Sequence, residues 1–226
     1  MILEQQKDQL EIDYHNFKHI SFDLWLTLIK SNPEFKAKRN LLFKEYFDIE
    51  SPIEKVAQQI RYYDVFCNTI NERTGLNFDT NEIYLLILAS LNVSIQEIEL
   101  EKLDGFYKEA ESLFLKFKPT LIYSNTKKFL NTVKSEGKSL NILSNTAFIK
   151  GYTLRKVIAF YELEESFDFQ LYSDESGFSK PNKKFFELIQ KEVPHIEKSK
   201  ILHVGDNEIA DYKGAIDFGF QALLIK

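Results

Sequence analysis

Residues 200–225 read KILHVGDNEIADYKGAIDFGFQALLI, and this stretch decides the fold class. A short β-type run at 200–205 is followed by a helical segment at 207–218, which ends at Gly219, and by a second apolar run at 220–225. Two strands joined through a helix pair in parallel, with a right-handed crossover. The stretch therefore predicts one strand–helix–strand unit of a parallel sheet.

The same alternation of β-type and helical segments continues back to about residue 120. In chain order the segments are a helix at 124–136, a strand at 139–143, a helix at about 150–161, a strand at 167–172 and a helix at 181–192. We assign an earlier β-type run, 18–23, to the same sheet. Strands separated by helices predict an α/β fold with a parallel sheet.

The part of the chain between the first strand and the alternating segments has a different pattern. Residues 34–118 carry apolar side chains at helical spacing and predict about four antiparallel helices, the first at about 34–48. The motifs SPIE (51–54), DTNE (79–82) and SIQE (94–97) each predict a capping box at a helix start. We therefore predict a core of residues 1–30 plus 119–226, with an inserted helical cap at 31–118.

Composition and charge exclude several classes of protein. Only eight glycines and five prolines occur among 226 residues, which favours long regular elements over disorder. The formal net charge is −5, so the chain as a whole lacks the excess of basic residues that is typical of nucleic-acid-binding proteins. No nucleic-acid partner is therefore expected. No signal peptide and no run of about 18 apolar residues is evident, so we expect no membrane segment and a cytoplasmic location.

Two smaller features complete the outline of the chain. The single cysteine, Cys67, excludes an internal disulfide and a multi-cysteine zinc site, and it is expected to be a buried structural thiol. The polar, acidic segment 1–17 is expected to be a short helix or a strap that leads into the first strand.

Residues able to carry chemistry follow the predicted strands. Ligands bind at the carboxyl ends of the strands in an open parallel sheet, so side chains placed there converge on one edge. Those side chains are Asp23 after the first strand, Ser144 and Asn145 after the strand at 139–143, Lys180 in the loop SDESGFSKP, and Asp206 and Asp211 after the strand at 200–205.

This combination has a physical logic. Asp23, Asp206 and Asp211 repel one another unless a cation lies among them, and hard carboxylate oxygens select Mg²⁺. Ser144, the backbone amides of the turn after it and Lys180 can hold a phosphate beside that metal. With its charge offset, Asp23 can act as a nucleophile. The residues therefore predict attack on phosphorus, with an aspartyl-phosphate that water then hydrolyses.

Four motifs in order, SFDLWLTLI, NILSNT, SDESGFSKPNKKFF and HVGDNEIADYKGA, lie between residues 20 and 218, each at the end of a predicted strand. Together they identify the chain as similar to the haloacid dehalogenase-like hydrolase superfamily. The resemblance implies a Rossmann-like parallel sheet core with an inserted α-helical cap. It also implies a hydrolase, most simply a phosphatase that takes a small phosphorylated molecule as substrate.

The resemblance assigns roles to individual residues. It makes Asp23 the nucleophile and a metal ligand, and it makes the backbone carbonyl of Trp25 a second ligand. Asp206 binds Mg²⁺, and Asp211 is a ligand or steers a metal-bound water. The remaining assignments are that Ser144 and Asn145 hold the phosphoryl group, that Lys180 neutralises charge and that Thr27 stabilises the turn after the nucleophile.

Trp25 departs from the pattern of the family's phosphatases. Those enzymes usually carry an Asp two residues after the nucleophile, which protonates the leaving oxygen, and an indole cannot do this. General acid–base catalysis is worth about 10²–10⁴ in rate. A catalytically weak protein that binds phosphate, metal or a partner is therefore one alternative. A carbon–halogen hydrolase is another, although Asp206 and Asp211 favour metal and phosphate. The substrate, and the choice between a monomer and a homodimer, stay open.

Overall fold

The strand β1 (His19–Phe22) lies at the centre of a parallel sheet in the computed structural model, which describes residues 9–225. The sheet order over these residues is β5-β4-β1-β6-β7, and every neighbouring pair is parallel. The other strands are β4 (Ser139–Ser144), β5 (Phe169–Tyr172), β6 (Ile201–Gly205) and β7 (Gln221–Leu224). All four residues of β1 are buried, as expected for a strand covered on both faces. The predicted α/β class with a parallel sheet is confirmed.

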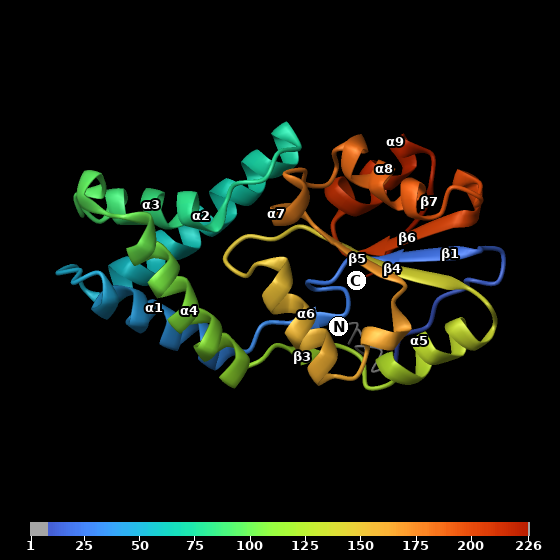
Figure 1. Cartoon of the computed structure of the whole chain (residues 1–226), viewed down its shortest axis with the longest axis horizontal. Coiled ribbons are helices and arrows are strands. Elements are labelled where there is room, and N and C mark those ends of the chain that lie inside the picture. Colours follow the sequence, from blue (N-terminus) through green and yellow to red (C-terminus); the bar gives the residue numbers. More distant parts are fainter. Residues whose placement is uncertain (1–8, 226) are drawn as a thin grey trace, which may run out of the picture.

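Helices cover both faces of the sheet (Figure 1). They are α5 (Thr126–Ser135) and α6 (Gly151–Phe160) on one side and α8 (Lys183–Glu192) and α9 (Gly214–Phe218) on the other. Shorter elements are α7 (Ser173–Ser176) and 3₁₀ turns at Ile95–Glu97, Glu164–Ser166 and Lys198–Lys200. Buried Phe185 and Phe186 of α8 pack with Phe220 in the core on the α8–α9 side. This packing fixes the loops at the carboxyl edge of the sheet.

Four α-helices stand between β1 and the short strand β3 (Thr120–Leu121) in the chain, on the left of Figure 1. They are α1 (Pro33–Tyr46), α2 (Ile53–Thr74), α3 (Thr80–Ser90) and α4 (Leu100–Lys116), and we call them the helical insertion. Phe106 lies at the centre of their aromatic core, with ring centroids 5.2 Å from Phe43 and 4.9 Å from Tyr84. At its base, β2 (Ile29–Lys30) and β3 (Thr120–Leu121) pair antiparallel. The division of the chain into a core and a cap domain stays a prediction.

One of the three predicted capping boxes is confirmed and two are wrong. Asp79 caps α3, where its side chain accepts from Asn81 N while Asp79 N donates to Glu82 Oε2, both at 2.8 Å. At the SPIE motif the helix begins one residue later than predicted, with Pro52 at the cap position and no side-chain bond. At SIQE the Ser94 hydroxyl donates to Gln96 instead of accepting an amide, and only a 3₁₀ turn forms before α4.

One further prediction needs correction, and one alternative that the sequence left open is resolved. The helix predicted at 207–218 is a π-helix over Glu208–Lys213 followed by the short α9. The N-terminal segment is a strap rather than a helix from residue 9 on, with Leu10 and Ile12 buried, and residues 1–8 lie outside the described part. Asn125 holds this strap, because its side chain bonds both Leu10 N (2.7 Å) and Leu10 O (3.1 Å). This pairing is non-local, so helix periodicity could not reveal it.

Cys67 lies buried in α2, and burial raises the pKa of its thiol to about 11, so the predicted buried thiol is confirmed. Across residues 9–225, no helix combines the length and the apolar character needed to cross a membrane.

Candidate active site

A sharp turn presents Asp23 at the carboxyl end of β1. Leu24 O accepts from both Leu28 N (2.9 Å) and Ile29 N (3.0 Å), and Leu26 adopts a left-handed conformation with φ 59°. A non-glycine residue in that region costs about 1–3 kcal/mol, and such strain clusters at functional sites. Thr27 Oγ1 donates to Asp23 Oδ2 at 3.2 Å, so Thr27 contacts the carboxylate itself.

Lys180 lies between two buried carboxylates. Its Nζ is 2.6 Å from Asp23 Oδ1 and 2.6 Å from Asp211 Oδ1, and all three side chains are buried. Burial opposes the charge of Lys180, but Asp211 and Asp23 together raise its pKa above the ordinary value. Removing one partner from such a buried arrangement leaves an uncompensated charge, at a cost of about 3–5 kcal/mol. Lys180 therefore connects the end of β1 with the π-helix that follows β6.

The π-helix directs Asp211 back toward the sheet. Asp211 Oδ2 accepts from Asn207 N at 2.9 Å, and His203 Nε2 lies 3.1 Å from Oδ1. Burial acts against the Asp211 charge, yet Lys180 and His203 hold the pKa of this carboxyl below its usual range. Gly205 permits the approach, since a Cβ there would lie 2.2 Å from Asp211 Cγ. Isolated π-type turns of this kind are frequent at functional sites.

His203 is a satisfied core residue, as its place inside a predicted strand indicates, but sequence reasoning did not predict its contact with Asp211. Its other ring nitrogen lies 3.0 Å from Ser21 Oγ, so both nitrogens have partners and the ring is buried within β6. Its spacing from other histidines gave no signal of a site.

Three carboxylates could hold a cation at this edge. Asp23, Asp206 and Asp211 each offer an oxygen atom, and these atoms lie within 4.8 Å of one another. Burial, opposed by Lys180 and reinforced by Asp211 and Asp206, raises the pKa of Asp23 to about 7. Burial and Asp211 also raise the pKa of Asp206. One lysine does not offset three carboxylates, and a hard divalent cation such as Mg²⁺ fits this oxygen set.

The side chain of Asn145 forms hydrogen bonds with the backbone of Lys180. Its Oδ1 accepts from Lys180 N (2.8 Å) and its Nδ2 donates to Lys180 O (3.1 Å). Ser144 is fully buried, its hydroxyl donates to Asn145 O at 3.3 Å, and it does not line the pocket. The structure thus brings Asp23, Lys180, Asp206, Asp211 and Asn145 together. That Ser144 holds a phosphoryl group and that the Trp25 carbonyl binds metal stay predictions.

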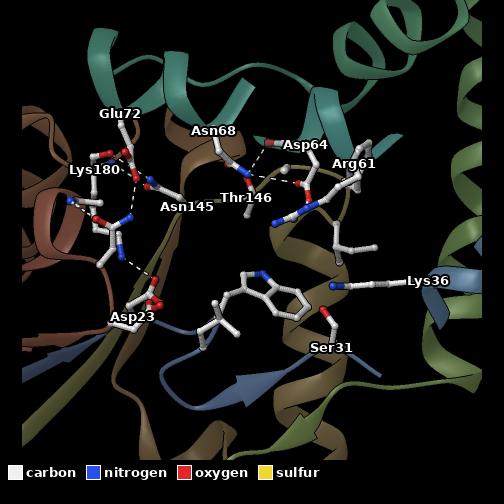
Figure 2. Close-up of a pocket in the computed structure, with 18 of the residues that line it drawn as sticks. Asp23, Ser31, Lys36, Arg61, Asp64, Asn68, Glu72, Asn145, Thr146 and Lys180 are labelled. Carbon is white, nitrogen blue, oxygen red and sulfur yellow. Dashed lines mark hydrogen bonds and ion pairs between the residues drawn. The ribbon is translucent and has the colours of Figure 1, made fainter. Parts of the chain in front are cut away.

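A pocket of about 380 Å³ opens from this cluster toward the helical insertion (Figure 2). Its wall includes three groups of side chains: the aromatic Trp25, Phe35, Phe114 and Phe148, the cationic Lys36, Arg39 and Arg61, and the polar Asp64, Asn68 and Glu72 of α2. Residues 64, 68 and 72 are spaced by four and therefore share one face of the helix. Sequence reasoning assigned no role to this face, because no motif marks it.

The helical insertion is attached to the loop that carries Lys180. Leu76 and Phe178 form an antiparallel bridge, and Asn77 Oδ1 accepts from Ser173 Oγ (2.7 Å) and Ser179 Oγ (3.3 Å). The connection between α2 and α3 therefore pairs directly with the segment before the lysine.

Two curated proteins match parts of this chain. Haloacid dehalogenase-like hydrolase domain-containing protein 3 of Homo sapiens is 30% identical over 96 residues, 42% of this chain and 36% of that protein. Pyrimidine 5'-nucleotidase YjjG of Escherichia coli (strain K12) is 37% identical over 57 residues, 25% of each chain. The matches thus span about a third and a quarter of the relatives' lengths.

Solved structures and a family model extend the likeness to nearly the whole chain. The magnesium-bound HAD-hydrolase YfnB of Bacillus subtilis superposes with a TM-score of 0.69 at 18% identity, covering 92% of this chain and 88% of that one. A family model described as haloacid dehalogenase-like hydrolase matches residues 17–219. With the strand order and the residues gathered at the carboxyl edge of the sheet, this match establishes that the chain belongs to the haloacid dehalogenase-like hydrolases.

Proposed function

We propose that this hydrolase is a Mg²⁺-dependent phosphatase of a small phosphorylated molecule and that it acts through an aspartyl-phosphate on Asp23. The observation that carries the proposal is the cluster at the sheet edge, where Lys180 lies 2.6 Å from Asp23 and three carboxylates lie within reach of one cation. Lys36 and Arg39 on the pocket wall form no ion pair within residues 9–225, and their charges favour an anionic substrate.

Each residue of the cluster has a part in this chemistry. Asp23 supplies the attacking carboxylate oxygen, and Lys180 offsets negative charge as the phosphoryl group approaches. Asp23, Asp206 and Asp211, with the Trp25 carbonyl, would hold the metal, which when bound supplies charge neutralisation for the phosphoryl oxygens. Asn145 and Thr27 keep Lys180 and Asp23 in position through the bonds described above.

The size of the pocket and one named relative suggest which phosphorylated molecules to test first. Its size suits a small metabolite, and one relative that matches a quarter of the chain is named a pyrimidine 5'-nucleotidase, so nucleoside monophosphates belong in the first substrate panel. A cytoplasmic location and a monomeric or homodimeric state are part of the same proposal.

The decisive assay uses purified protein and an aryl phosphate, with and without Mg²⁺. We expect metal-dependent release of phosphate that is lost in Asp23→Asn. The same low turnover in both proteins with Mg²⁺ present would contradict the proposal.

Trp25 stands where the family's phosphatases usually carry an Asp. This replacement favours a second candidate, a catalytically weak protein that binds phosphate, metal or a partner. Turnover distinguishes the phosphatase from the binding protein. A binding protein would show a shift in melting temperature with Mg²⁺ or phosphate but would not hydrolyse the substrate. Carbon–halogen hydrolysis is disfavoured by Asp206 and Asp211, and halide release from a 2-haloacid in the presence of chelator would support it.

A further inference from the structure

Five carboxyl groups line the pocket in the described chain, and two of them lie outside the metal-binding cluster, both on α2. Asp64 is occupied, since its Oδ2 lies 3.0 Å from Arg61 Nη1 in an ion pair. Glu72, two helical turns further along the same face, pairs with no lysine, arginine or histidine within residues 9–225. Glu72 is therefore the pocket carboxyl that neither the cluster nor an ion pair uses.

Glu72 is held in a defined place. Asn207 Nδ2 donates to Glu72 Oε1 at 2.6 Å, while Asn207 N is bound to Asp211, so one residue connects this carboxyl to the cluster. The second oxygen of Glu72 makes no hydrogen bond among the described residues. Figure 2 shows Glu72 pointing from α2 into the pocket, at the end where Lys180 and Asn145 lie.

The geometry of phosphoryl transfer places the leaving oxygen on the side of Glu72. Attacking and leaving oxygens lie roughly in line on opposite sides of phosphorus. Asp23 attacks from the sheet edge, so the leaving oxygen faces the helical insertion, whose α2 carries Glu72. Trp25 lines the same pocket but its indole N–H is a donor that does not release its proton.

We propose that Glu72 is the general acid and base of the reaction, a part that Trp25 cannot perform; this inference rests on the proposed phosphatase function. In the first step the bond from Asp23 oxygen to phosphorus forms and the bond from phosphorus to the substrate oxygen breaks. The electron pair stays on that oxygen, which takes the proton of the Glu72 carboxyl group and leaves as an alcohol.

The second step reverses the proton transfer. Water attacks phosphorus, gives one proton to the Glu72 carboxylate, and the bond from phosphorus to Asp23 breaks with its electron pair returning to the carboxylate. The sum is one phosphoester and one water converted to an alcohol and inorganic phosphate, with Asp23 and Glu72 restored. A single carboxyl group thus serves both steps.

The test compares two substrates in Glu72→Gln, which keeps an oxygen to accept from Asn207 and loses the transferable proton. The substrates are para-nitrophenyl phosphate, whose leaving group departs without a proton, and glycerol phosphate, whose leaving group requires one. We expect kcat/KM to fall about 10²–10⁴-fold for glycerol phosphate and less than about 10-fold for para-nitrophenyl phosphate. We also expect a burst of para-nitrophenolate, because the variant lacks the base for the second step.

Two further variants separate this role from a structural one. Asp64→Asn removes a carboxylate from the same helix face. We expect the ratio of kcat/KM for glycerol phosphate to kcat/KM for para-nitrophenyl phosphate to stay at its native value in this variant. Trp25→Asp added to Glu72→Gln supplies a carboxyl beside Asp23 and is expected to restore the ratio. Equal losses on both substrates without a burst would overturn the role of Glu72 while the phosphatase function stood. Absence of Asp23-dependent turnover in the native protein would overturn both.

Discussion

Asn145 clamps the backbone of Lys180 from both sides, accepting from its amide nitrogen at 2.8 Å and donating to its carbonyl oxygen at 3.1 Å. The two residues are 35 positions apart, at the ends of different strand–loop units. The position of the lysine ammonium between Asp23 and Asp211 therefore depends on an amide side chain that forms no hydrogen bond with either carboxylate within residues 9–225.

Asn145→Ala should consequently act through Lys180. Loss of two hydrogen bonds is expected to cost about 1–3 kcal/mol of unfolding free energy. A lysine displaced by about 1 Å is expected to lower kcat about 10²-fold. Denaturant unfolding and phosphatase assays check the two effects. Asn145→Asp retains the acceptor and should lose less stability than Asn145→Ala; if both variants keep native kcat, the clamp does not position the lysine.

Mg²⁺ should stabilise the folded protein, because it neutralises carboxylates that otherwise repel one another. At a concentration 100 times its dissociation constant the stabilisation is about 2.7 kcal/mol. Asp206→Asn is expected to reduce the rise in melting temperature caused by Mg²⁺ and, without metal, to raise the melting temperature by relieving repulsion of Asp211. Asp64→Asn is the matched control and should retain the native Mg²⁺ response. An undiminished response in Asp206→Asn would show that the ion binds elsewhere.

Trp25→Asp alone should change the activity toward glycerol phosphate by less than about 10-fold, since Glu72 already supplies a transferable proton. Trp25→Phe controls for loss of the indole, whose centroid lies 6.3 Å from that of Phe114 in the pocket wall. Steady-state kcat/KM values of both variants toward glycerol phosphate check this prediction. A rise of 10-fold or more in Trp25→Asp would mean that the native protein lacks an effective acid, which favours the weakly catalytic alternative.

His19 should make the protein less stable as the pH falls. Burial lowers its pKa from 6.5 to about 4, and both ring nitrogens lie 2.7 Å from partners, Ser139 Oγ and Asn141 Oδ1. Between these pH values the unfolded chain binds a proton that the folded chain does not, so unfolding free energy decreases from pH 6.5 toward pH 4. Above pH 6.5 the ring is neutral in both states and the full stability is present. The loss amounts to about 3 kcal/mol.

Urea unfolding across this pH range checks the prediction. His19→Gln should show a flatter dependence of unfolding free energy on pH than the native protein. His195→Gln replaces an exposed histidine that forms no ion pair within residues 9–225, and it serves as the matched control, which should keep the native slope. Parallel slopes for the native protein and His19→Gln would show that the acid sensitivity arises at other groups.

Much of the fold and part of the site could be read from local patterns. The alternation of apolar runs and helical segments predicts a parallel sheet, because side-chain periodicity and the right-handed crossover rule act over short stretches of chain. The carboxyl ends of parallel strands meet at one edge of the sheet, so the sequence alone could group Asp23, Lys180, Asp206 and Asp211. The helical content of the insertion followed from spacing in the same way.

Sequence alone thus determined the fold class, the family motifs and the group of charged residues at the sheet edge. Tertiary structure alone decided the π-helix that turns Asp211 inward, the Asn145 clamp and the entry of Glu72 into the pocket. The physical reason is separation along the chain: Glu72 and Asn207 are 135 residues apart, and Asn145 and Lys180 are 35 apart. Contacts of that range arise only when packing of the helices on the sheet brings distant segments together, and no local pattern of residues encodes them.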